Sequence, residues 1–367
     1  MHLESIRLAN FKNYESAQLE FSPQVNCFLG PNGSGKTNLL DAIYYLAITK
    51  SAEQSQDQLC IKHQETFFSI KGKMNFGTKS EEVLCTLEIG KKKSIRLDGV
   101  PYKKASEHVG KIPVVLIAPN DTDIIRGASD ERRKFFDAIL SQTDAVYLSN
   151  LIAYNHALKQ RNSLLKRFAE QNTFDADLLE PFTLKLIELG TYIHKRRKEA
   201  LNFFKPLLQS HYENISDDGE KVDVVYQSHF EKDVAKAYTD SLQKDMILKR
   251  TNVGIHKDDF DFLMEERPIK KFGSQGQQKS FLISLKLANY DFLKEQKGKE
   301  PILLLDDIFD KLDDNRIAKL IEMVASDQFG QIFITDARPE RSIGFFEELN
   351  IDSSFFNVDS GLTSLLE

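Results

Sequence analysis

One octapeptide near the N-terminus combines residue types that bind phosphate groups. It runs Gly30-Pro31-Asn32-Gly33-Ser34-Gly35-Lys36-Thr37 and matches the phosphate-loop pattern G-x-x-x-x-G-K-[ST] at every fixed position. Its glycines allow backbone N–H groups to turn inward around phosphate oxygens, where side chains would clash. We expect Lys36 to reach the β- and γ-phosphates of a nucleotide and Thr37 to ligate Mg²⁺. Asn38, the next residue, completes the predicted nucleotide-binding segment.

Two neighbouring acids follow an apolar run in the C-terminal third of the chain. Residues 302–305 read Ile-Leu-Leu-Leu, and Asp306 and Asp307 come directly after them. Because a buried strand fixes the residue at its end, we expect Asp306 to lie in the Mg²⁺ shell. Asp307 would orient or deprotonate the attacking water. The predicted catalytic residues are therefore Lys36 and Asp307, and the predicted metal ligands are Thr37 and Asp306.

A third segment, Gly273-Ser274-Gln275-Gly276-Gln277, precedes a long helical pattern. Ser274 and the first N–H groups of that helix would form a second anion-binding end. Serine is also a favoured N-cap, so a plain helix cap is the alternative. The segment lies about thirty residues before the acidic strand. In this position it resembles the signature loop of ABC-type ATPases. In that class the loop of one subunit closes over the nucleotide of another, so the resemblance adds Ser274, Gly276 and Gln277 to the nucleotide-binding residues.

The elements around the phosphate loop fit its chemistry. Residues 25–29 are apolar and strand-like, and residues 37–48 carry apolar side chains at a helical spacing. A strand, loop and helix in this order place a helix N-terminus at the phosphates. Alternating patterns predict antiparallel strands at 67–75, 83–89 and 94–97.

The character of the chain changes after residue 120. From residue 121 to about 212 the sequence has almost no strand signal, and helical patterns dominate. Strand-like runs return at 222–226, 302–305 and 332–334. We therefore predict an α/β fold with a P-loop ATPase domain in two parts, residues 1–120 and residues 216–367. An all-helical domain, residues 121–215, is inserted between them.

Length and composition limit the function classes. The 367 residues suffice for two or three domains, and 41% hydrophobic with 28% charged residues is ordinary for a globular protein. No apolar run approaches the ~18 residues of a membrane span, and the first residues do not resemble a signal peptide. The three cysteines show no metal-ligand spacing. We predict a cytoplasmic protein without membrane contact. A net charge of −6 argues against a wholly basic nucleic-acid coat protein but allows a local basic face.

Several segments together resemble the RecF family of recombination mediators, which shares its ATPase head with the SMC proteins. The segments follow the family order over most of the chain and are residues 10–14, 118–121, 124–127, 132–137, 158–162, 254–259 and 275–279. Ser129 and Ile255 stand where the family usually has proline, and Asp310-Lys311 replaces a small-acidic pair. Thr335-Asp336 stands where a switch histidine is expected.

This resemblance implies an SMC head-like, ABC-type ATPase that uses ATP and Mg²⁺ and dimerises on ATP. It implies binding to DNA, double-stranded and gapped, at single-strand/double-strand junctions. It further implies action with RecR and RecO to help load RecA in DNA repair and replication restart. Asp307 in place of a longer glutamate, together with the missing histidine, implies weak, DNA-dependent ATP hydrolysis. Leu312-Asp313 would form the D-loop of the class, and Gln54, Gln56, Gln58 and Gln64 are all candidates for its nucleotide-sensing glutamine.

Basic side chains are the candidates for DNA contact. Three clusters lie at 91–93, 132–134 and 195–198, and a solvated surface is the alternative for each. The segment 153–168 is more suggestive because it holds Lys159, Arg161, Lys166 and Arg167 and no acid. Since no aromatic residues interleave for base stacking, we expect contact with the backbone of duplex DNA. His256 could sense phosphate or cap a turn, and we favour the structural role.

Three other classes of protein share parts of this pattern. In the ATPase subunit of an ABC transporter, the signature loop follows the phosphate loop much more closely than Ser274 follows Lys36 here. A structural SMC-type head needs long heptad arms, which the helical block lacks. A nuclease-associated ABC ATPase remains an alternative that a DNA cleavage assay with Mg²⁺ or Mn²⁺ would decide.

Overall fold

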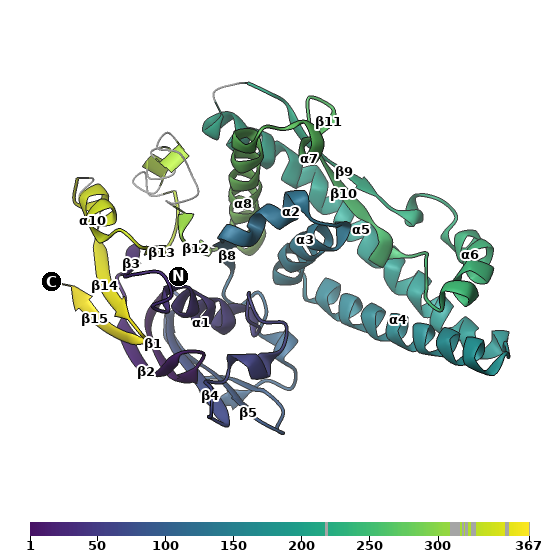
Figure 1. Cartoon of the computed structure of the whole chain (residues 1–367), viewed down its shortest axis with the longest axis horizontal. Coiled ribbons are helices and arrows are strands. Elements are labelled where there is room, and N and C mark those ends of the chain that lie inside the picture. The colour runs from purple at the N-terminus through teal and green to yellow at the C-terminus, as the bar shows by residue number, and fades with distance from the viewer. Residues whose placement is uncertain are drawn as a thin grey trace. The chain divides into compact units, whose positions relative to one another are not determined.

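The computed structural model describes residues 1–216, 219–308, 316–317, 319, 322–323, 328–348 and 352–366. Chain contacts divide it into two compact units (Figure 1). The first unit comprises Met1–Asp121 and Leu285–Glu367, and the second comprises Thr122–Ser284. The predicted D-loop, Leu312-Asp313, and the pair before it, Asp310-Lys311, lie outside the described residues.

The first unit holds a six-stranded antiparallel sheet in the order β2-β1-β4-β5-β6-β7. Its strands are β1 (His2–Phe11), β2 (Tyr14–Glu20), β4 (Phe67–Asn75), β5 (Ser80–Glu88), β6 (Ser94–Leu97) and β7 (Val100–Pro101). Side chains alternate along β4, so that Phe68, Ile70 and Met74 are buried. This alternation is the pattern from which the sequence predicted the strands.

A second six-stranded sheet in the same unit has the order β15-β14-β3-β13-β12-β8. Its strands are β3 (Val25–Leu29), β8 (Val114–Ile117), β12 (Ile302–Leu305), β13 (Ile332–Asp336), β14 (Ser353–Asp359) and β15 (Leu362–Leu366). All neighbours are parallel except β14 and β15. The strands β3, β12 and β13 are buried along their whole length, as their mainly apolar sequences favour. Because they are parallel, their carboxyl ends lie at one edge of the sheet.

Helix α1 (Lys36–Ile48) joins the two sheets into one core, because it contacts strands of both. Leu39, Ile43 and Leu46 are buried in this core together with side chains from each sheet. A Cβ atom on Gly72 of β4 would lie 2.5 Å from Leu46 Cδ1, so a glycine at this position allows the helix to approach the sheet closely. Helix α10 (Pro339–Glu348) follows β13.

The second unit is built mainly on helices. They are α2 (Thr122–Arg126), α3 (Ser129–Thr143), α4 (Ala145–Gln171), α5 (Ala176–Ile215), α6 (Val234–Leu248) and α7 (Ile269–Phe272). Helices α4 and α5 run side by side (Figure 1). Asp144 accepts hydrogen bonds from the N–H groups of Val146 and Tyr147, and Asp175 accepts one from Leu178 N–H, so each helix has an aspartate N-cap.

The second unit extends beyond the predicted helical insertion. Residues 122–215 are helical as expected, but the unit continues to Ser284 and includes a three-stranded sheet. That sheet has the order β11-β10-β9, with β9 (Val222–Gln227), β10 (Asp259–Met264) and β11 (Arg267–Pro268). Strand β9 packs against α5, so segments far apart in sequence join the helices in one unit. The unit boundary falls within α8 (Gln275–Lys297). None of the helices in the described part of the chain is long and apolar enough to cross a membrane.

Candidate nucleotide site

The phosphate loop connects the end of β3 to the start of α1 in a conformation that requires glycine. Gly30, Gly33 and Gly35 have φ values of 154°, 82° and 115°, which L side chains rarely adopt. A Cβ atom on Gly30 would lie 2.2 Å from Val358 O, and one on Gly35 would lie 2.4 Å from Asn13 Nδ2. The loop can therefore keep this shape only with glycine at both positions.

The N-terminal hairpin supports the loop from outside. Asn13 Nδ2 donates to Ser34 O at 3.3 Å, and Tyr14 OH donates to Gly35 O at 3.0 Å. Asn38 Nδ2 donates in turn to Asn13 Oδ1 at 2.7 Å. These bonds use carbonyl groups of the loop and none of its N–H groups, of which those of Gly30 and Ser34 donate to Asp336 O and Pro31 O. The sequence marked Asn13 and Tyr14 only as part of a family segment, so their supporting role is new.

Two features of the loop fit a bound anion. Ser34 Oγ is buried and has no hydrogen-bond partner in the described part of the chain. Lys36 is 4% exposed and donates to Gly30 O at 2.8 Å and Pro31 O at 3.1 Å. Within the described residues it has no carboxylate partner. A buried cation without a counter-ion is costly, and phosphate oxygens would supply the missing negative charge.

The predicted metal ligands lie together. Thr37 Oγ1 is 2.9 Å from Asp306 Oδ1 and 3.1 Å from Asp306 Oδ2. Among the residues the structure describes, no group of three or more His, Cys, Asp or Glu side chains could hold a metal ion. One hydroxyl and one carboxylate fit Mg²⁺, which keeps most of its shell as water and phosphate oxygens. The residues present therefore fit the ion that the phosphate loop implies.

A hydroxyl that the sequence did not assign connects the two acids. Thr335, at the end of β13, donates to Asp306 Oδ1 at 2.8 Å and accepts from Asp307 N–H at 2.8 Å. Asp307 has a left-handed backbone, with φ 44°, and no described residue bonds its buried Oδ1. The sequence showed only that a threonine stood where a histidine was expected. Pairing of β12 with β13 gives it a role, because Leu305 lies opposite Ile334.

The pKa of Asp306 is affected by its burial and by nearby charges, one of which lies in the segment after α1. Burial is the main cause that raises the pKa of Asp306, and the carboxylates of Asp307 and Glu53 add to the rise. Hydrogen bonds from Thr335 and Thr37 oppose it. Because Glu53 acts on Asp306, the segment before Gln54 lies near the metal ligands. All four candidate glutamines are exposed, and Gln54 is the one next to Glu53 in sequence.

The predicted signature residues lie in the second unit, where they form a reciprocal helix cap. Ser274 N–H donates to Gln277 Oε1 at 2.7 Å, and Gln277 N–H donates to Ser274 Oγ at 3.2 Å. Gln277 Nε2 donates to Glu220 Oε1 at 2.6 Å, and Tyr212 OH donates to Glu220 Oε2 at 2.6 Å. Because Ser274 Oγ accepts a bond within the cap, its own proton is free for an outside acceptor. The cap and the anion-binding interpretations are therefore compatible.

The structure corrects the predicted DNA contacts on α4. Arg161 is 1% exposed, and its Nη1 lies 2.7 Å from Asp245 Oδ2 in a buried ion pair. It cannot reach DNA, because its position on the helix falls on the buried face. Lys159, Lys166 and Arg167 are exposed on α4 and have no ion-pair partner in the described part of the chain. The apolar period of this helix already placed position 161 on its inner face, and that signal could have found the error.

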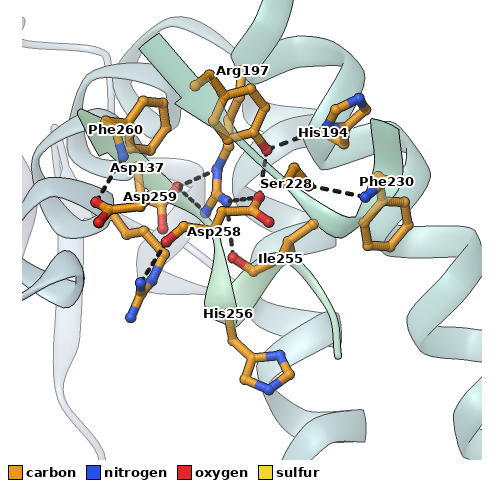
Figure 2. A network of polar contacts seen from close by, with 12 residues as sticks. Asp137, His194, Arg197, Ser228, Phe230, Ile255, His256, Asp258, Asp259 and Phe260 are labelled. Atoms are coloured by element: carbon orange, nitrogen blue, oxygen red, sulfur yellow. Dashed lines mark hydrogen bonds and ion pairs between the residues drawn. The ribbon is translucent and has the colours of Figure 1, made fainter. Parts of the chain in front are cut away.

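Two more arginines from the basic clusters are paired with carboxylates of the same unit. Arg197 is 1% exposed and lies 2.8 Å from carboxylate oxygens of both Asp137 and Asp258 (Figure 2). Arg132 pairs with Asp259 through its Nε at 2.7 Å. Each of these arginines compensates a carboxylate of the same unit, so neither is a free contact for DNA.

His256 has the structural role that we favoured. Its Nδ1 lies 2.8 Å from Tyr154 OH, and its Nε2 lies 3.1 Å from Thr251 O. Burial lowers the pKa of His256 to about 4, so the ring is neutral near pH 7. A neutral ring with both nitrogens bonded within the fold has no capacity left for phosphate.

Comparison with known proteins shows first the structural class of this chain and then its family. The model of the "RecF/RecN/SMC N terminal domain" matches residues 2–348. A solved SMC head bound to the C-winged helix domain of ScpA covers 100% of this chain and 97% of its own, with a TM-score of 0.58 and 14% identity, a likeness of fold alone. The fold and the phosphate loop thus define an ABC-type ATPase of the SMC-head class.

Closer relatives carry one name. The DNA replication and repair protein RecF of Flavobacterium johnsoniae is 47% identical over 98% of this chain and 100% of the relative. RecF of Cytophaga hutchinsonii is 48% identical over 98% and 96%. A solved structure of the recombination mediator RecF with ATP, in the RecFOR pathway, has a TM-score of 0.89 and 31% identity and covers 100% of this chain and 98% of its own. The chain belongs to the RecF family of DNA replication and repair proteins.

Proposed function

We propose that this chain is an ATP-dependent DNA-binding protein that serves DNA repair and replication. The observation that carries the proposal is the buried Lys36, held at the phosphate loop without a carboxylate partner among the described residues, beside the contact of Thr37 with Asp306. A family relative was solved with ATP, which supports ATP as the nucleotide.

At the nucleotide site the chain supplies binding, orientation and proton acceptance. N–H groups of the loop and Lys36 Nζ donate to phosphate oxygens, and Lys36 exchanges its carbonyl contacts for them. Thr37 and Asp306 would hold Mg²⁺, which would supply positive charge to offset that of the nucleotide phosphates. Asp307 accepts a hydrogen bond from the attacking water through its unpaired Oδ1. Its short side chain reaches less far than a glutamate would, which supports slow hydrolysis.

The signature loop completes the cycle by closing on the nucleotide of a second copy of this chain. The free proton of Ser274 Oγ and the N–H groups at the start of α8 suit a γ-phosphate. ATP then holds two copies together, and hydrolysis separates them. This homodimer follows from the family resemblance, as do RecR and RecO as partners, help in loading RecA, and a cytoplasmic location.

For DNA, the exposed side of α4 offers three cations, Lys159, Lys166 and Arg167, and α4 carries no acid before Glu170. Phosphate contacts of this kind are independent of sequence, which suits a protein that acts at gaps and at single-strand/double-strand junctions.

A nucleotide titration of Lys36→Ala tests the site. We expect ATP affinity to fall by roughly ten- to a hundredfold, because the variant lacks one charge-assisted contact to phosphate. Lys185→Ala is the control, since Lys185 is an exposed residue whose surface ion pair with Glu188 contributes little. An unchanged ATP affinity in Lys36→Ala, with the fold intact by circular dichroism, would overturn the proposal.

A further inference from the structure

Four cationic side chains of the second unit have no carboxylate partner in the described part of the chain. They are Arg133 on α3, Lys244 on α6, Arg250 just after α6, and Lys257, and we call them the cation patch. Lys244, Arg250 and Lys257 are exposed. Arg133 is partly buried, and its Nη1 donates to two neutral oxygens, Ser129 Oγ at 2.7 Å and Asp258 O at 2.6 Å.

Three acids that adjoin the cation patch in sequence are already paired with other arginines. Asp258 lies 2.8 Å from Arg197, and Figure 2 shows its carboxylate turned toward that guanidinium. Asp245 lies 2.7 Å from Arg161, and both side chains are buried. Asp259 pairs with Arg132, the neighbour of Arg133 in sequence, and Arg132 Nε lies 2.7 Å from Asp259 Oδ1. These three carboxylates therefore pair with arginines outside the patch, and the patch cations form no ion pair with described residues.

The cations of the patch are close enough to act on one another. Partial burial is the main cause that lowers the pKa of Lys257, and the positive charges of Arg250, Arg133 and Lys244 lower it further. Asp245 opposes the shift without cancelling it. His256 adds no charge near neutral pH, because burial lowers its pKa to about 4. Like charges that repel in the free protein gain from an outside anion.

We propose that the cation patch binds the phosphodiester backbone of duplex DNA. The inference rests on the proposed function, in which this chain binds DNA, and three of the four patch cations lie outside the basic clusters that the sequence indicated. The patch comes from three separate segments and is open, whereas a site for one free phosphate needs donors that converge in an enclosed pocket. Duplex DNA presents a negative charge about every 1.7 Å, which suits several spaced cations.

The test is DNA binding by the triple variant Lys244→Gln, Arg250→Gln and Lys257→Gln. These three side chains make no ion pair with described residues, so the variant should keep its thermal stability and its ATP affinity. Binding of a 30-base-pair duplex is measured by anisotropy between roughly 50 and 200 mM salt. We expect affinity to fall about tenfold or more, and the log–log salt slope to fall by about 0.9 for each lost contact.

The control removes the same charge from cations that are already paired. Lys185→Gln, Lys195→Gln and Lys198→Gln lie in the same unit, and their ammonium groups pair with Glu188, Glu199 and Glu231. The control should bind DNA nearly as wild type does. If both triple variants lose the same affinity, net charge alone is responsible and the patch inference is wrong.

Further outcomes separate the alternatives. Wild-type binding that is equal in phosphate and chloride buffers of matched ionic strength supports a DNA backbone surface, whereas selective inhibition by inorganic phosphate would point to a compact phosphate site and overturn the proposal. A patch variant with wild-type affinity and slope would refute the patch while leaving DNA binding intact. If wild type itself does not bind the duplex, the proposed function fails, and the inference falls with it.

Discussion

Two buried cations of this chain have opposite surroundings. Lys36 is 4% exposed and bonds carbonyl oxygens of the phosphate loop, so its charge remains available to a ligand. Arg161 is 1% exposed and bonds the carboxylate of Asp245, so its charge is compensated within the fold. Burial is nearly the same in both. The presence of a carboxylate partner therefore decides whether a buried cation is a binding residue or a structural one.

At the residue scale, Thr335→Val tests the hydroxyl between the two acids. Valine keeps the branched shape but can neither accept from Asp307 N–H nor donate to Asp306. We expect ATP affinity to stay within about threefold and kcat to fall roughly ten- to a hundredfold, because hydrogen bonds to charged groups contribute about 1.5–3 kcal/mol. The nucleotide-free variant should also lose about 1–3 kcal/mol of stability, since a buried N–H is left unpaired.

Thr335→Ser is the matched variant, because it restores the hydroxyl and lacks only the methyl group. Its kcat and its free energy of unfolding should lie close to wild type. If serine is as defective as valine, packing of the side chain, and not its hydrogen bonds, accounts for the effect.

At the element scale, helix α4 has an exposed face, which we propose binds DNA, and a buried face, which contains Arg161. Changing Lys159, Lys166 and Arg167 to alanine should weaken DNA binding at unchanged stability and lower the salt slope by about 0.9 per lost phosphate contact. Arg161→Ala should instead lower the free energy of unfolding by about 3–5 kcal/mol, because it leaves Asp245 buried without its partner. Salt-dependent anisotropy and urea unfolding measure the two effects. Equal DNA binding by the triple variant would return these cations to a solvated surface.

The signature loop at the start of α8 gives a second prediction at this scale. Ser274→Arg should leave the monomer folded and able to bind ATP, since Ser274 is exposed and lies in the other unit from the phosphate loop. The larger side chain should block ATP-dependent dimerisation by filling the space that the γ-phosphate of a second copy needs. Light scattering with ATP and with ADP reads the result. A dimer that still forms with ATP would contradict the shared site.

At the scale of the whole molecule, Asp307→Asn separates binding from hydrolysis. The amide keeps the shape of the side chain but cannot take a proton from water, so turnover should drop by about 10²- to 10⁴-fold while ATP still binds through Asp306. If hydrolysis opens the dimer, the variant should stay on DNA longer than wild type in ATP, and ADP should still release both. Dissociation at the wild-type rate in ATP would mean that hydrolysis is not the release step.

Much of the nucleotide site could be predicted because its signals are local. A phosphate loop, the strand before it and the helix after it occupy one continuous stretch, and the loop glycines adopt the backbone angles that only glycine tolerates easily. The contact between Thr37 and Asp306 was also predicted, although 269 positions separate them. Each follows a strand of the parallel sheet, and the carboxyl ends of such strands meet at one edge.

The sequence by itself determined the α/β class, the phosphate loop, the acidic strand and the family, because each is written in residues that are neighbours along the chain. Tertiary structure alone decided which charges stay free. Arg161 and Arg197 look like surface cations in sequence, yet each finds a carboxylate on another element and is buried. Thr335 acquires its role only where β13 lies beside β12. The role of a charged or hydroxyl side chain depends on its hydrogen-bond and ion-pair partners. Partners that are distant in sequence come together only when the chain folds.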